Sequence, residues 1–418
     1  MSTESLFKYI CRVPEIKYIL LMFFSTRIVL NIIGVLSRTI MKPHSSFSSN
    51  SWLAVWGVWD TGWYMDISQN GYTSRSLDQL LVQQTNIAFF PLYPSLMRFL
   101  GSIIGNHYIA GIIVSNFCLI VSCVYLYRLV RLDSGEANSI RSIKYLLIFP
   151  TSFILSGVFS ESLYLALTLM CFYYARKGKW HLVGITGFCL SLTRSIGVLV
   201  ILPLLYELLM QFRKEKKEII SFKNPREIIL PLFYLAFIPL GIISYMIYNY
   251  YLTGDFLAFA HAQVMWGRHA ANPLVVLIHG YHGSIYSAFE AAFAAITIFI
   301  FILFYRKIRF SYWLFGMYSI FVPLSTGIMS MPRFILVIFP LYILFADITK
   351  NHVIDEKTTS TRDAKNGKIL QTLNEQKMHP NSQSNSMNQY SEELVTLTFA
   401  LFQGFLMVFW TNGSWLVV

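Results

Sequence analysis

The segment YILLMFFSTRIVLNIIGVL, Tyr18–Leu36, decides the fold class of this chain. It is an almost unbroken apolar run, and a helix needs about 20 such residues to cross the hydrocarbon core of a bilayer. The run contains one charged residue, Arg27, and lacks the small-residue site at which a signal peptide is cleaved. We therefore predict a retained first membrane helix.

The composition of the whole chain extends this prediction. Of its 418 residues, 55% are hydrophobic and only 13% are charged, whereas a soluble protein of this length needs more charge to cover its surface. Together with this first run, which starts near residue 17, the apolar runs start near residues 108, 145, 162, 182, 196, 228, 288, 312, 333 and 394. We predict an all-α polytopic membrane protein with about eleven membrane helices and a re-entrant segment.

The formal net charge of +12 indicates orientation in a membrane rather than nucleic-acid binding, because the basic residues form short runs between apolar segments. All these runs lie on one face under three conditions. The N-terminus is cytoplasmic, the segment 88–104 is re-entrant because Pro91 and Pro94 interrupt it, and the region 182–211 makes two passes that meet near Arg194.

The predicted organisation has three parts. Residues 1–350 form the transmembrane domain, 351–390 form a disordered polar cytoplasmic loop, and 391–418 form the last membrane helix and an outer tail. The loop is rich in Lys, Asn, Ser, Thr and Gln, so it cannot bury enough apolar surface to fold. The five cysteines show no CxxC or metal-type spacing.

The stretch VWDTGWYMDISQNGY, Val58–Tyr72, is unusually polar for such a chain and lies on the outer face in this topology. Other polar segments reach the same face: Glu161, Arg194, HAQVMWGRHAANP at 261–273, SMPRF at 330–334 and TNGSW at 411–415. A charge within the membrane costs roughly 3 kcal/mol on insertion scales, so it is tolerated chiefly where it lines a wet cavity. We therefore expect these residues to share one site.

A structural interpretation stands beside each functional one. Glu161 and Arg194 also fit a structural ion pair, and Arg333 also fits a helix cap or a side chain that extends to the interface. Trp59, Trp63 and Tyr64 also fit interfacial anchors. His261, Gln263, Trp266 and Arg268 also fit ordinary loop residues.

The combination of residue types predicts glycosyl transfer from a lipid-phosphate sugar. A carboxylate removes a proton from an attacking hydroxyl, and arginines neutralise a phosphate leaving group. Asp60 and Tyr64 share one helical face, whereas Asp60 and Asp66 do not. A transporter or scramblase of lipid-linked sugars is the alternative, but it requires polar residues on both faces of the membrane. A scaffold subunit is a third interpretation.

Five motifs in order resemble the PIG-V type mannosyltransferases (GPI mannosyltransferase 2-like), a family of the GT-C superfamily. They are WDTGWY…NGY at 59–72, AFFPLYP at 88–94, TSFILSGVFSESLY at 151–164, LTRSIGVL at 192–199 and SMPRFILVIFPLY at 330–342. The resemblance implies a GT-C fold, a lumenal or extracytoplasmic active site, a polyprenyl- or dolichyl-phosphate mannose donor and inversion at the anomeric carbon. It also implies that Asp60 corresponds to the family's presumed base.

One departure from the family leaves the acceptor open. The YWNVG-type motif of animal and fungal members is absent, and HAQVMWGRHAANP in its place looks more like prokaryotic members. The acceptor is a GPI intermediate in the endoplasmic reticulum membrane, or another lipid- or protein-linked glycan in a prokaryotic cell membrane. We favour the prokaryotic type.

We assign the candidate residues as follows. The catalytic residue is Asp60; the donor phosphate-binding residues are Arg194 and Arg333; the sugar- or acceptor-binding residues are Trp63, Tyr64, Glu161, His261, Gln263, Trp266 and Arg268; the lipid groove comprises Phe89, Phe90, Pro91 and Tyr93. No metal ligands and no certain cofactor are predicted, although a divalent cation stays an open alternative. The expected partners are a lipid-linked sugar donor, a glycan acceptor and membrane lipids, without nucleic acid.

Overall fold

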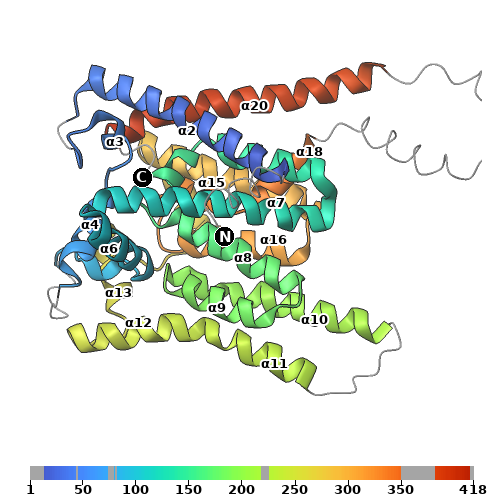
Figure 1. Ribbon diagram of the computed structural model, residues 1–418, viewed down its shortest axis with the longest axis horizontal. Helices are drawn as coiled ribbons and strands as arrows, with labels where there is room; N and C mark the ends of the chain where they lie inside the picture. Colours follow the sequence, from blue (N-terminus) through green and yellow to red (C-terminus); the bar gives the residue numbers. More distant parts are fainter. Residues whose placement is uncertain are drawn as a thin grey trace, which may run out of the picture.

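The computed structural model describes residues 14–43, 46–73, 80, 82–217, 226–349 and 382–414. Within these residues the chain is all-helical and has no strand (Figure 1). The α-helices are α2 (Pro14–Met41), α3 (Ser51–Ala54), α4 (Thr61–Asn70), α6 (Leu92–Ile104), α7 (His107–Ile148), α8 (Glu161–Arg176), α9 (Trp180–Ser191), α10 (Ile201–Lys217), α11 (Arg226–Leu235), α12 (Phe237–Thr253), α13 (Ala258–His261), α14 (Pro273–Tyr281), α15 (Ile285–Leu303), α16 (Phe310–Leu324), α17 (Met331–Leu336), α18 (Pro340–Ile348) and α20 (Ser382–Thr411). Five short 3-10 helices are η1 (Asn86–Ala88), η2 (Ser152–Ser156), η3 (Ser195–Val200), η4 (Ala262–Trp266) and η5 (Tyr305–Lys307).

Six helical stretches in the described residues are long and apolar enough to cross a membrane. They are Glu15–Met41, His107–Ile148, Ser195–Arg213, Ile228–Thr253, Ile285–Leu303 and Ser391–Thr411. Several expose large apolar side chains, as a lipid-facing surface requires: Leu21, Ile28, Ile296, Phe299 and Leu401. The protein is therefore an integral membrane protein, as predicted, whereas the number of about eleven membrane helices stays a prediction.

The centre of the bundle is α8, which is buried along almost its whole length and packs against α7 and α9. Its sequence, ESLYLALTLMCFYYAR, is apolar on every side, and such a helix belongs in a core. Figure 1 shows α2 and α20 side by side along one edge and α11 and α12 along the other. It also shows α4, α6 and α13 gathered at one end.

Arg27 of the first membrane helix has a structural role at the end of α7. Its guanidinium donates to the carbonyl oxygens of Leu147 and Ser152, both at 2.9 Å. Gln403 of α20 donates to the same Leu147 carbonyl at 2.9 Å and to that of Phe149 at 3.1 Å. A helix end inside a membrane protein leaves carbonyls without intrahelical partners. Arg27 and Gln403 satisfy them, so these polar residues stabilise the fold.

The predicted break near Arg194 is confirmed. Helix α9 ends at Ser191, and Arg194 is extended (φ −156°, ψ 147°) before η3 and α10 continue the chain. The last helix begins earlier than the predicted boundary at residue 391. Helix α20 begins at Ser382, inside the segment 351–390 that we predicted to be disordered. A helix that an apolar segment has nucleated extends at little cost into polar residues. Residues 350–381 lie outside the described residues.

A second charged network lies at the opposite end of α8 from Glu161. Arg176 donates to Asp133 at 2.7 Å, and Arg309 donates to Glu207 at 3.1 Å. Arg176 and Arg309 belong to two of the short basic runs that the sequence predicts on the cytoplasmic face. Sequence spacing did not reveal this network because its members come from α7, α8, α10 and the start of α16. The two acids and two arginines form ion pairs with one another, so the network connects neighbouring helices and has a structural role.

Close packing of α9 against α12 depends on Gly241. A methyl group there would lie 2.4 Å from the Phe188 carbonyl oxygen and 2.9 Å from Ser191 Cβ. We expect Gly241→Ala to destabilise the protein by about 1–3 kcal/mol, because the helices must separate. Thermal unfolding in detergent micelles measures the effect. The matched control is Gly404→Ala, whose methyl group meets Ile33 Cδ1 at an ordinary 3.4 Å; equal unfolding temperatures for the two variants would contradict the packing argument.

Candidate active site

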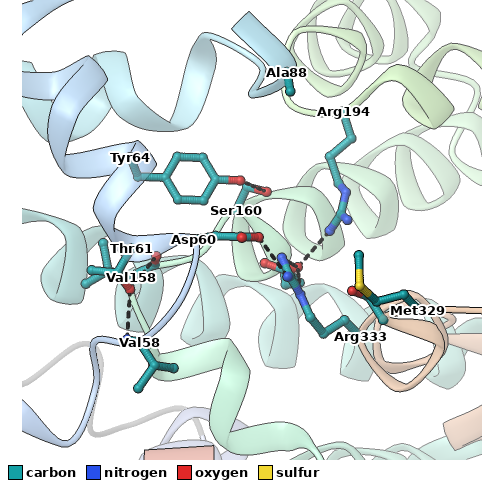
Figure 2. A network of polar contacts seen from close by, with 12 residues as sticks. Val58, Asp60, Thr61, Tyr64, Ala88, Val158, Ser160, Arg194, Met329 and Arg333 are labelled. Atoms are coloured by element: carbon teal, nitrogen blue, oxygen red, sulfur yellow. Dashed lines mark hydrogen bonds and ion pairs between the residues drawn. The ribbon is translucent and has the colours of Figure 1, made fainter. Parts of the chain in front are cut away.

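The turn before α4 fixes the position of Asp60. Trp59 has a left-handed backbone (φ 48°), which is strained for a non-glycine residue. The Thr61 hydroxyl holds this turn by accepting from the Val58 amide at 3.1 Å and facing the Val158 carbonyl at 3.5 Å (Figure 2). Non-glycine strain of this kind persists where surrounding contacts impose it, and it concentrates at functional sites.

Tyr64 docks α4 onto the segment before α8. Its hydroxyl donates to Ser160 Oγ at 2.9 Å, next to Glu161 in the chain (Figure 2). Burial is the main cause that raises the pKa of Tyr64 above its ordinary value, so the phenol stays protonated and keeps donating. The contact brings Asp60 alongside Glu161, one hundred residues later in the sequence.

Arg333 joins the two carboxylates. Its Nη1 donates to Asp60 Oδ2 at 2.7 Å (Figure 2). Its Nη2 and Nε donate to Glu161 Oε1 at 2.8 and 3.0 Å. Glu161 has no exposed surface, and Arg333 is buried. The sequence analysis placed Arg333 in the same site as Asp60, and the structure has the two side chains in direct contact.

Arg194 approaches Glu161 from a third element. Its Nη1 donates to Glu161 Oε1 at 2.9 Å. The remaining oxygen, Glu161 Oε2, has no hydrogen-bond partner among the residues that the structure describes. Glu161 thus binds two arginines and holds them in place. A contact between Glu161 and the sugar, which the sequence suggested, stays a prediction. Asp60, Glu161, Arg194 and Arg333 together carry no net formal charge.

The segment 329–330 positions Arg333. Ser330 has a left-handed backbone (φ 70°), and its amide donates to Glu290 Oε1 at 2.6 Å. Arg268 Nη2 donates to the Met329 carbonyl at 3.1 Å. Glu290 was not among the predicted site residues, although it is the single acid in the apolar run of α15, a signal that could have identified it.

An aromatic wall stands beside this network. Trp63 stacks on Phe89 with ring centroids 5.9 Å apart, and Trp266 meets both rings edge-on at 5.8 and 5.9 Å. Tyr64 packs against Phe89 at 5.3 Å. Trp63 and Tyr64 come from α4, Phe89 comes directly after η1, and Trp266 comes from η4. The wall therefore combines residues predicted for the sugar site with one predicted for the lipid groove.

The other predicted groove residues occupy different environments. Tyr93 is fully buried and hydrogen-bonds to the Gly111 carbonyl at 3.1 Å, and Phe90 packs against Tyr245 in the core. Pro91 lines a cavity of about 310 Å³ that α4, α6 and α12 border. Its other lining residues are Ile67, Gly71, Tyr72, Ser95, Arg98, Leu192, Ser244, Tyr245 and Tyr248.

The loop 261–273 contributes residues in three ways. Gln263 reaches the Ala88 carbonyl at 3.5 Å, whereas exposed His261 binds Asp255 at 2.6 Å, away from the charged network. Arg268 lies over the Phe334 ring at 5.1 Å, and Arg194 lies over the same ring at 5.1 Å. Phe334, which follows Arg333 in the SMPRF motif, was not among the predicted site residues.

Asp66 lies apart from Asp60. Its carboxylate accepts from the amides of Asn86 at 2.7 Å and Asn70 at 2.9 Å. Within the described part of the chain, no group of three or more His, Cys, Asp or Glu side chains is arranged to hold a metal ion.

No protein-family model and no curated protein matches the chain. Among solved structures it is similar to ArnT from Cupriavidus metallidurans bound to undecaprenyl phosphate, with 12% identity, 95% of this chain and 76% of that chain covered, and a TM-score of 0.48. It is also similar to the apo oligosaccharyltransferase of Archaeoglobus fulgidus, with 11% identity, 94% and 56% coverage, and a TM-score of 0.49. The chain thus spans just over half the length of the archaeal enzyme.

Proposed function

We propose that this protein is an inverting glycosyltransferase of the GT-C type. It moves a sugar, mannose by its PIG-V-like motifs, from a polyprenyl- or dolichyl-phosphate donor to a lipid- or protein-linked glycan. One observation carries the proposal: Arg333 binds Asp60 and Glu161 beside an aromatic wall, at one end of a membrane-protein bundle. A base, cations and a ring-binding surface are the components that this reaction needs.

Asp60 is the proposed general base. Arg333 holds its Oδ2, and no described residue donates a hydrogen bond to its Oδ1. In the proposed step, Asp60 takes the proton of the acceptor hydroxyl while the hydroxyl oxygen bonds to the anomeric carbon. The bond from that carbon to the phosphate oxygen breaks, its electron pair leaves with the lipid phosphate, and the configuration inverts.

Arginines supply the electrostatic part of the proposed mechanism. The departing lipid phosphate gains negative charge, and fixed guanidinium groups in a site of low dielectric stabilise such charge strongly. From the chemistry of the residues, the sequence predicts Arg194 and Arg333 for this task, and Arg268 is a third arginine at the same site. Because arginines can do it, no step in the proposal passes through a metal ion.

The lipid route follows from the cavity at Pro91. Tyr72 and Tyr245, which line it, both donate to the Phe89 carbonyl, at 2.7 and 3.1 Å, so the cavity adjoins the aromatic wall. Helix α6 borders it and exposes Phe99 and Ile103, as a membrane-embedded helix does. We propose that the donor lipid enters laterally here and that Trp63 and Trp266 contact its sugar.

Direct transfer tests the proposal. Purified protein in lipid vesicles receives radiolabelled polyprenyl-phosphate mannose together with membrane glycolipid and glycopeptide acceptors. We expect labelled product with inverted anomeric configuration, and the acceptor that becomes labelled distinguishes a GPI intermediate from another glycan. Polyprenyl-phosphate glucose is the control for the sugar. Movement of the labelled lipid between leaflets without any transfer would overturn the proposal in favour of a scramblase.

A further inference from the structure

Three guanidinium groups meet at the candidate site, and two of them already have carboxylate partners. Arg333 uses Nη1, Nη2 and Nε on Asp60 and Glu161, and Arg194 uses Nη1 on Glu161. An incoming anion would have to compete with these buried carboxylates for either arginine. Breaking a buried ion pair is costly because it leaves a charge uncompensated.

In the part of the chain that the structure describes, Arg268 has only neutral acceptors. It donates to the Met329 carbonyl at 3.1 Å and weakly to Thr326 Oγ1 at 3.4 Å. Among the described residues, no carboxylate lies within 4 Å of its guanidinium. Glu290 of α15, the next acid along the chain, accepts the Ser330 amide instead.

The charge of Arg268 is retained at neutral pH. Burial, followed by the positive charges of Arg333 and Arg194, lowers its pKa to about 10. The group therefore stays protonated. Because the positive charges of Arg333 and Arg194 destabilise its charged form, a bound anion would stabilise Arg268 strongly. Counted with the neutral set of Asp60, Glu161, Arg194 and Arg333, the five residues carry a formal charge of +1.

We propose that Arg268 binds the donor phosphate, while Arg194 and Arg333 remain bound to Glu161 and Asp60. This inference rests on the proposed glycosyl transfer. The formal charge of +1 matches a phosphodiester between sugar and lipid, which carries one negative charge. Trp266 lies two residues earlier in the same loop and belongs to the aromatic wall, so a phosphate at Arg268 places the attached sugar beside that wall.

The arginine is tested with and without turnover. In the transfer assay, Arg268→Ala is expected to raise the KM for the lipid-phosphate sugar by roughly 10- to 100-fold, as the loss of a charged hydrogen bond implies. The KM for the acceptor stays unchanged, and Arg268→Lys restores part of the loss because it keeps the charge. Lys42→Gln, which removes an exposed positive charge between α2 and α3, is the matched control and keeps the wild-type KM.

Dodecyl phosphate tests phosphate binding without glycosyl transfer, because it has a lipid chain and a phosphate but no sugar. Its binding therefore tests the role of Arg268 separately from the proposed function. We expect it to raise the thermal unfolding temperature of wild-type protein and Lys42→Gln in micelles, but not that of Arg268→Ala. Unchanged binding by Arg268→Ala would overturn the inference whether or not the wild type transfers sugar. An equal effect of inorganic phosphate would overturn its lipid part. Loss of binding in Arg268→Ala together with an inactive wild type would support the anion site and refute only the glycosyl transfer.

Discussion

Asp60→Asn is expected to lower the transfer rate by roughly 10²- to 10⁴-fold, the range that a general base contributes. The amide cannot take the hydroxyl proton, but it keeps the size of the side chain and one oxygen that can accept from Arg333 Nη1. We therefore expect the loss in kcat rather than in the KM for the donor. Initial rates of label transfer from lipid-phosphate mannose measure it.

The matched control is Asp66→Asn, in helix α4, which begins directly after Asp60. Asp66 is held by Asn70 and Asn86 and has no contact with Arg333, so its transfer rate should stay close to that of the wild type. Thermal unfolding of both variants shows whether they are folded. Near-normal turnover by folded Asp60→Asn would exclude the base assignment, and an equal loss in Asp66→Asn would show that the effect is not specific to Asp60.

Glu161→Leu is expected to lower the free energy of unfolding by about 3–5 kcal/mol, because it leaves Arg194 and Arg333 without their shared buried partner. Glu161 Oε1 accepts three hydrogen bonds from these two arginines, and the side chain has no exposed surface. Leucine supplies apolar volume but no compensating charge. Thermal or detergent-induced unfolding of purified protein measures the change.

Glu392→Gln provides the comparison. Glu392 pairs with Lys144 at 2.5 Å, but its side chain is 24% exposed. Ion pairs that water can reach contribute less than fully buried ones, so this variant should lose less stability than Glu161→Leu. If Glu161→Leu were as stable as Glu392→Gln, the buried network would not hold α8, η3 and α17 together.

Much of the architecture could be predicted from the sequence, because its signals are local. The apolar run 18–36 specified a membrane helix, and the polar residue Arg194 inside an apolar region marked the break between α9 and η3. The same local reasoning missed the pairing of Arg176 with Asp133 and of Arg309 with Glu207 at the other end of the bundle. Their partners lie on different helices, and spacing along one helix carries no information about them.

What the sequence by itself determined is the membrane class of the protein and the set of polar residues in it, because the cost of placing a charge in lipid applies wherever the chain folds. Which of these charges pair was decided only by the tertiary structure. Glu161 became a buried anchor, Asp60 kept an oxygen without a donor among the described residues, and Arg268 remained without a carboxylate. The physical reason is distance: an ion pair depends on separations of a few ångströms, and these are set by the packing of segments 33 to 273 residues apart in the sequence.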